Sequence, residues 1–256
     1  MDASAIAVTM GDPAGIGPEI IARTFADEGR ENRALEGARC VVADAARDED
    51  LEALVRDVPD PSEVLWAGSA GLARALGNVH PGPHAGATPA AAAARKVLVV
   101  VGSLSGVSRE QVRALAEELG CEAVPVGRFG VDEEARGATR AALSGSSCAA
   151  VHSAEDRDAP GAGSFVGALA EVVAGLSGEG HFDALVLTGG ETAVGVARRL
   201  GAVGIRLEGE VEPGVPVGSL IGPRPYRVVT KAGAFGEPGT LVRAVERLLE
   251  SGKDRD

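Results

Sequence analysis

From residue 96 onward, short apolar runs alternate with longer amphipathic segments. The apolar runs are rich in Val, Leu and Ala and predict buried strands, whereas the segments between them repeat their apolar residues at helical spacing. Regular alternation of this kind predicts an α/β domain with a mostly parallel sheet and helices on both faces. The predicted order is strand 97–101, helix 109–119, strand 122–126, helix 132–143, strand 148–152, helix 163–176, strand 184–187 and helix 192–200. Apolar runs at 204–207, 217–221 and 226–230 precede a last helix at 241–249 and predict a mixed edge of the sheet.

The N-terminal part carries a shorter version of the same pattern. It begins with strand 5–9, a glycine-rich loop and a helix that Pro18 opens. Two strand–helix pairs follow, strand 40–43 with helix 48–58 and strand 64–67 with helix 72–76. We expect a smaller, truncated α/β domain over residues 1–77. Residues 78–95 are rich in Pro, Gly and Ala without an apolar period, which predicts an interdomain linker before a second domain at 96–256.

Charge and cysteine usage narrow the class of protein. The net charge is −12, and lysine occurs only at Lys96, Lys231 and Lys253, which argues against nucleic-acid and anionic-membrane partners. The three cysteines are far apart and form neither a disulfide framework nor a CxxC metal site. No apolar run approaches the ~20 residues that span a bilayer. We expect a soluble cytoplasmic protein.

The segment Gly102-Ser-Leu-Ser-Gly follows an apolar strand and precedes a helix. Backbone N–H groups and hydroxyls at such a position can bind an anion, so Ser103 and Ser105 are candidate phosphate ligands. The alternative is an ordinary turn in which Ser108 caps the helix.

A second loop of the same kind is Leu187-Thr-Gly-Gly-Glu-Thr. Its paired glycines allow close backbone approach, and hydroxyl and carboxylate groups follow at the start of a helix. Phosphate, ribose or magnesium could therefore bind at Gly189, Gly190, Glu191 and Thr192. The alternative is that Glu191 and Thr192 only cap the helix.

A third loop, Thr230-Lys-Ala-Gly-Ala-Phe-Gly, places a rare lysine beside glycines at the end of a strand. Lys231 would supply a point charge for phosphate, and Gly233 and Gly236 would leave room for a flat ring or polyphosphate. A surface turn is the alternative. Neither GxxxxGK[ST] nor a strand-linked GxGxxG occurs, so an ATP site would be of another kind.

The runs GSLSG, LVLTGGETA, EVEPGVPVG and VVTKAGAFG occur in the order and spacing of the four-carbon acid sugar kinases, which this chain resembles. The resemblance implies an ATP site with magnesium, formed by the three loops above. Segments VVADA and WAGSAGLA look like the last part of the same family's substrate domain, which would place Asp44 and Ser69 near the sugar acid.

The front of the chain departs from that family, which begins with a strand and an Asp-Asp-x-Thr-Gly motif that this chain lacks. Asp12 could replace the catalytic aspartate of that motif; the alternative is a turn-forming Asp-Pro in a truncated or fused remnant. Residues 8–20 resemble the opening of 4-hydroxythreonine-4-phosphate dehydrogenases. That family's metal-binding histidines have no counterpart among the four histidines of this chain, which argues against dehydrogenase activity. His80 and His84 have a spacing that could bind zinc on a helix, but Pro81 and Pro83 forbid that helix, so we assign no metal ligand.

Three functions follow. The first is an ATP-dependent kinase that phosphorylates a four-carbon sugar acid (threonate, erythronate or 3-oxo-tetronate type), with catalysis impaired if the missing motif is not replaced. The second is a non-catalytic nucleotide-binding module or a partner of a separate dehydrogenase. The third is an NAD enzyme like the dehydrogenases. A shortened substrate domain would also expose apolar surface, which a homodimer would cover.

Overall fold

The computed structural model describes residues 5–9, 39–43, 45–81, 92–102, 105–127, 133–154 and 163–250. The chain divides into two compact units, Met1–Gly86 and Ala87–Asp256. The helix expected after Pro18 lies outside the described residues.

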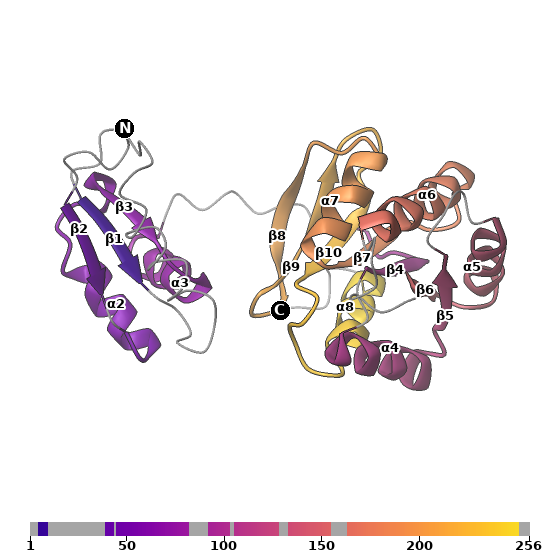
Figure 1. Ribbon diagram of the computed structural model, residues 1–256, viewed down its shortest axis with the longest axis horizontal. Helices are drawn as coiled ribbons and strands as arrows, with labels where there is room; N and C mark the ends of the chain where they lie inside the picture. The colour runs from indigo at the N-terminus through magenta and orange to yellow at the C-terminus, as the bar shows by residue number, and fades with distance from the viewer. Residues whose placement is uncertain are drawn as a thin grey trace. The chain divides into compact units, whose positions relative to one another are not determined.

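The first unit contains a three-stranded parallel sheet in the order β2-β1-β3 (Figure 1). Two helices, α2 and α3, share a small core that contains Val55, Leu72 and Ala75. The elements are β1 (Ala5–Thr9), β2 (Arg39–Ala43), α2 (Asp48–Arg56), the 3-10 turn η1 (Pro61–Glu63), β3 (Val64–Ala67) and α3 (Ala70–Val79). The strand, helix and strand expected between residues 40 and 67 are therefore present.

The second unit is built on a seven-stranded sheet in the order β5-β6-β4-β7-β10-β9-β8. Its first five strands run parallel, and β9 and β8 complete it antiparallel. The strands are β4 (Val97–Val101), β5 (Glu122–Val126), β6 (Cys148–Ser153), β7 (Ala184–Thr188), β8 (Gly204–Glu212), β9 (Val215–Ile221) and β10 (Arg227–Lys231). This confirms the predicted mostly parallel sheet with a mixed edge.

Helices cover both faces of this sheet, as Figure 1 shows. Strand β4 is apolar throughout because its side chains alternate between two cores. Leu98 and Val100 pack with α5, α6 and α7, whereas the odd-numbered valines of β4 pack with α4 and α8. The helices are α4 (Gly106–Leu119), α5 (Glu133–Gly145), α6 (Gly163–Glu179), α7 (Gly190–Arg199) and α8 (Thr240–Leu249).

Helices α4 and α7 begin earlier than their apolar pattern predicts. Helix α4 starts at Gly106 instead of residue 109, and its cap is Ser105, whose hydroxyl accepts a hydrogen bond from the Ser108 N–H at 3.1 Å. The cap is therefore Ser105 and not Ser108, and an ordinary turn stays the alternative to a phosphate site. Helix α7 starts at Gly190, directly after the strand. A first turn is polar because it contacts loops instead of the core, so hydrophobic periodicity does not detect it.

Candidate functional site

Three of the candidate loops follow neighbouring strands at one edge of the large sheet. Val101, Thr188 and Lys231, the last residues of β4, β7 and β10, lie side by side in register. Helices α4 and α8 continue on one face of the sheet, and α7 continues on the other. In open α/β sheets, ligands bind outside the carboxyl ends of strands where successive connections leave toward opposite faces. The fold therefore brings the three loops together where a ligand is expected.

The loop after β7 leads directly into α7. Gly189 has φ of 92°, in the left-handed region that favours glycine, and its carbonyl oxygen accepts the Ala193 N–H at 2.9 Å. The first N–H groups of an α-helix have no intrahelical acceptor, which leaves those of Gly190, Glu191 and Thr192 available. A Cβ atom on Gly190 would meet nothing within 4 Å, and Glu191 is exposed. This helix start can receive an anion.

Thr188 carries an unpaired hydroxyl at the same edge. Its side chain is 1% exposed, and its Oγ1 atom has no hydrogen-bond partner among the described residues. A buried hydroxyl without a partner costs roughly 1–3 kcal/mol. A ligand group bound at this edge would remove that cost, so the hydroxyl points to a polar ligand.

Thr192 holds the loops after β4 and β7 in contact. A Cβ atom on Gly102 would lie 1.7 Å from Thr192 Oγ1, so the backbone at Gly102 lies directly against this side chain. The Gly102 N–H also donates to the Thr188 carbonyl oxygen at 3.4 Å. Thr192 is buried, and its position favours a packing role over direct contact with a ribose. Of the two serines predicted in the Gly102 loop, Ser105 caps α4, and Ser103 lies outside the described residues.

Lys231 contacts the loop that follows β10. Its ammonium group donates to the carbonyl oxygens of Ala232 at 2.8 Å, Gly233 at 3.2 Å and Phe235 at 2.8 Å. The residue is 4% exposed, and burial lowers the pKa of Lys231 to about 8, although the nearby Glu212 carboxylate opposes this shift. The lysine thus holds the loop instead of projecting from it.

Two side chains of α4, which the sequence analysis missed, hold the same loop. The Ser108 hydroxyl donates to the Gly233 carbonyl oxygen at 2.9 Å, and Gln111 Nε2 donates to those of Phe235 at 3.1 Å and Glu237 at 2.9 Å. Both side chains are fully buried. The spacing of these two residues was the signal that could have identified them. Ser108 and Gln111 lie three residues apart on the same helical stripe as the apolar Leu115, and polar side chains on a buried stripe require buried hydrogen-bonding partners.

Glu212, at the end of β8, ties the start of α8 to the sheet. Thr240 Oγ1 donates to its carboxylate at 2.6 Å, and Arg243 Nε donates at 2.7 Å. Burial alone would raise the pKa of Glu212, but these hydrogen bonds outweigh it and hold that pKa below its ordinary value. Gly236 lies against Thr240. The loop between β10 and α8 is therefore anchored at both ends.

The first unit has a similar arrangement at the carboxyl edge of its own sheet. Thr9 ends the central strand, is 5% exposed, and has an Oγ1 atom without a hydrogen-bond partner in the described ranges. A Cβ atom on Gly68 would lie 2.2 Å from this oxygen, and Ser69 next to it precedes α3 without a side-chain capping bond. Asp12 and Asp44, the other two predicted residues of this unit, lie outside the described residues.

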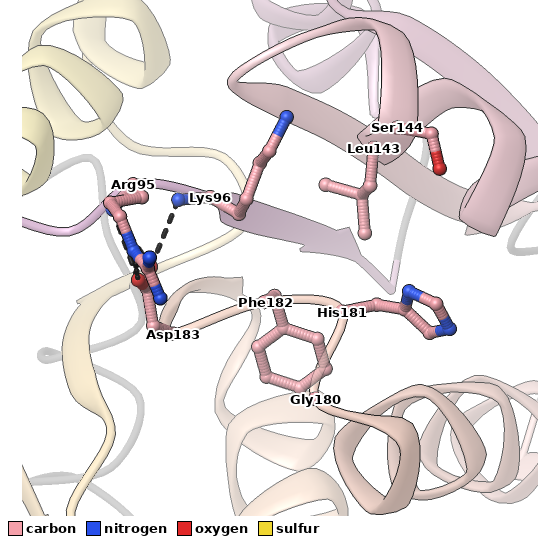
Figure 2. Close-up of a pocket in the computed structure, with 8 residues that line it drawn as sticks. All are labelled: Arg95, Lys96, Leu143, Ser144, Gly180, His181, Phe182 and Asp183. Carbon is pink, nitrogen blue, oxygen red and sulfur yellow. Dashed lines mark hydrogen bonds and ion pairs between the residues drawn. The ribbon is translucent and has the colours of Figure 1, made fainter.

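A hollow of about 330 Å³ lies at the opposite, amino edge of the large sheet (Figure 2). The Asp183 carboxylate accepts the backbone N–H groups of Arg95 at 3.0 Å and Lys96 at 2.9 Å. The Lys96 ammonium group donates to the Ser146 carbonyl oxygen at 2.7 Å, just beyond the end of α5. These charges satisfy backbone groups at helix and strand ends, and the hollow is remote from the three loops.

The described ranges lack two features. None of their helices is long and apolar enough to cross a membrane. No group of three or more His, Cys, Asp or Glu side chains gathers there as a metal site.

Family models match both units. A model described as a nucleotide-binding C-terminal domain matches residues 98–241, more than half of the chain. A model described as a sugar-binding N-terminal domain matches residues 8–76. The second match includes residues 8–20, the segment that resembles dehydrogenases, so the family model places that segment in a sugar-binding domain.

Characterised relatives and a solved structure agree with these models. A D-threonate kinase of Cupriavidus necator is 36% identical over 239 residues, which cover 85% of this chain and 56% of that protein. A 3-oxo-tetronate kinase of Methylobacterium radiotolerans is 32% identical over 238 residues, which cover 84% of this chain and 55% of that protein. This chain thus spans about half the length of these relatives.

The solved structure is a domain of unknown function from Bordetella bronchiseptica, described as a domain-swapped dimer with bound citrate. It is 32% identical, has a TM-score of 0.55, and the match covers 95% of this chain and 59% of that chain. Together with the domain model over residues 98–241, these likenesses show that the chain belongs to the four-carbon acid sugar kinase family.

Proposed function

We propose that this protein binds ATP and transfers its terminal phosphoryl group to a four-carbon sugar acid of the threonate or 3-oxo-tetronate type. The names of the relatives support the reaction class. The observation that carries the proposal is the buried hydroxyl of Thr188, which has no hydrogen-bond partner among the described residues and lies at the carboxyl edge of the sheet. Such a group requires a polar ligand, and the surrounding backbone favours an anionic one.

In this proposal, backbone groups bind the phosphates. The N–H groups at the start of α7 and the glycine-rich turn after β10 supply donors, and open space beside Gly190 and Gly233 admits the chain of phosphates. Magnesium is held in proteins by one or two carboxylates together with phosphate oxygens. Glu191, exposed in the first turn of α7, is the carboxylate that would hold it. Bound magnesium neutralises the charge that develops on the transferred group.

The sugar acid would bind to the first unit, whose family model is described as sugar-binding. Thr9, whose hydroxyl has no partner within the described ranges, and Ser69, whose side chain makes no capping bond to α3, offer hydrogen-bonding groups for a polyhydroxy acid. Asp12 and Asp44 remain proposals, Asp12 as the group that accepts the proton of the attacking hydroxyl. Transfer requires that this hydroxyl come in line with the terminal phosphate.

Dimerisation is a further part of the proposal. The Bordetella bronchiseptica structure is described as a domain-swapped dimer, and a homodimer of this chain is expected by analogy. Sedimentation equilibrium of the purified protein tests this expectation, because a mass equal to one chain at every concentration contradicts it.

Calorimetric titration with Mg-ATP and separately with NAD, followed by an ADP-release assay with threonate and erythronate, tests the proposed function. Binding of ATP with acceptor-dependent ADP release supports the kinase. Binding without release supports the non-catalytic module instead. Binding of NAD alone contradicts the proposal.

A further inference from the structure

The ammonium group of Lys231 has no donor left for a ligand. An ammonium group has three N–H donors, and three carbonyl oxygens of the following turn lie within 2.8 to 3.2 Å of Nζ. The residue is also buried, although it ends a strand at the edge where phosphate is expected to bind. A direct contact with phosphate would require Lys231 to give up one of these bonds.

The same turn has its carbonyl oxygens held inward and several N–H groups unused. Ser108 and Gln111 donate to carbonyl oxygens of residues 233, 235 and 237 in addition to the bonds from Lys231. Among the described residues, no partner accepts the N–H groups of Gly233, Ala234 and Gly236. Peptide units whose carbonyl oxygens are bound on one side leave their N–H groups for an anion, as in other backbone anion sites.

We propose that Lys231 is a positioning residue of the nucleotide site: it holds the carbonyl oxygens of the 232–235 turn so that the loop amides bind phosphate, and does not itself contact phosphate. This inference rests on the proposed nucleotide binding. It replaces the simpler expectation that a lysine in such a loop is a phosphate ligand.

Among the residues that the structure describes, the charge of Lys231 interacts with the Glu212 carboxylate, which Arg243 and Thr240 already hold. Burial outweighs this attraction and lowers the pKa of Lys231 to about 8. Above that pH the neutral amine has two donors for three carbonyl oxygens, so one of the three bonds is lost while the cost of burying the charge is relieved.

Hydrogen exchange of the nucleotide-free protein, measured for the wild type and Lys231→Met, tests the inference. The amides of Phe235, Glu237 and Thr240 are hydrogen-bonded within this loop and report its order. We expect their exchange to accelerate about tenfold in Lys231→Met, the change for loss of one charged hydrogen bond. Lys96→Met is the matched control, because it also removes a lysine–carbonyl bond, at the amino edge of the same sheet (Figure 2). Its exchange in residues 232–240 should match the wild type.

Mg-ATP titrations of the same three proteins complete the test. Weaker binding by Lys231→Met together with faster exchange supports the positioning role. Weaker binding with unchanged exchange overturns the inference and makes Lys231 a direct phosphate ligand. Unchanged binding also overturns it. If the wild type binds no nucleotide, the proposed function itself fails, which the wild-type titration alone reveals.

A second variant covers the case in which Lys231→Met does not fold. Ser108→Ala removes one bond to the Gly233 carbonyl oxygen and leaves the buried charge in place. We expect a smaller acceleration of exchange in the same segment, with weaker Mg-ATP binding. No change in either quantity overturns the inference.

Discussion

Gly102 and Thr192 are in direct contact across two loops, because a Cβ atom on Gly102 would lie 1.7 Å from Thr192 Oγ1. Gly102 follows β4, and Thr192 lies in the first turn of α7, ninety residues later in the chain. This contact sets the separation of the loops after β4 and β7. A change at either residue would therefore alter the space for a ligand that binds between those loops.

Gly102→Ala should destabilise the protein by about 1–3 kcal/mol, the usual cost of overpacking a tight site, and should weaken nucleotide binding. Urea unfolding and Mg-ATP titration measure the two effects. Adding Thr192→Ala should recover part of the lost stability, because it removes the nearest atom. As a control, Gly137→Ala in α5, where a Cβ atom meets nothing within 4 Å, should stabilise by ~0.5–1 kcal/mol. Equal losses in Gly102→Ala with and without the second change would contradict this account.

Thr188→Val should separate ligand binding from stability. Valine keeps the shape of the side chain and removes a hydroxyl that has no partner, so the free energy of unfolding should stay unchanged or rise by about 1 kcal/mol. If the hydroxyl binds phosphate, Mg-ATP affinity should fall about tenfold. Thr139→Val is the control. That buried hydroxyl donates to the Ala135 carbonyl oxygen at 2.7 Å, so its loss should lower stability and leave nucleotide binding intact. Full affinity in Thr188→Val would remove the observation on which the proposed function depends.

The stability of the protein should increase with pH above about 8 through Lys231. The folded protein holds this pKa at about 8, below the ~10.4 of an exposed lysine, so between these values the unfolded chain binds more protons. Between pH 7.5 and 9.5 the free energy of unfolding should rise by on the order of 2 kcal/mol. Lys231→Met should lack this rise, which urea unfolding at pH 7.5 and 9.5 measures. Parallel pH curves for the two proteins would show that Lys231 is not buried as a charge.

Cys121 and Cys148 should resist alkylation in the native protein. Both thiols are buried at the starts of neighbouring strands, and the hydrogen bond that Cys121 donates to Cys148, together with burial, raises the pKa of Cys121. The same hydrogen bond lowers the pKa of Cys148, so that thiol is protected by its burial alone. Because the thiolate is the reactive form and both side chains are buried, iodoacetamide should label the two cysteines only in urea. Peptide mass spectrometry will locate the labelled positions. Native labelling of either position at the rate of a free thiol would contradict the buried pair.

Much of the fold was predictable because strands and helices leave local patterns. The run at Val97–Val101 is apolar at every position, as expected for a strand covered on both faces, and the structure places it in the centre of the sheet. Errors gathered at helix starts, where Ser105 rather than Ser108 caps α4. The polar first turn has no apolar period, and which serine caps it depends on the dihedral angles of the loop.

The candidate site was predictable only in part. The three loops stood out because glycine and hydroxyl residues follow apolar strands. The sequence did not show that Ser108 and Gln111 would contribute, since their partners are more than 120 residues away in the chain. Nor did it show that Lys231 would turn toward its own loop, because a buried ammonium group is paired with the nearest acceptors that the fold supplies.

The sequence by itself determined the order of strands and helices, the mixed edge and the presence of three glycine loops, since each depends on residues close together in the chain. Only the tertiary structure decided that β7 lies between β4 and β10, which places Val101, Thr188 and Lys231 side by side. Strand order depends on contacts between distant segments and on how helices cover each face, and local periodicity carries no information about either. The unpaired hydroxyl of Thr188 and the bound ammonium group of Lys231 follow from that order.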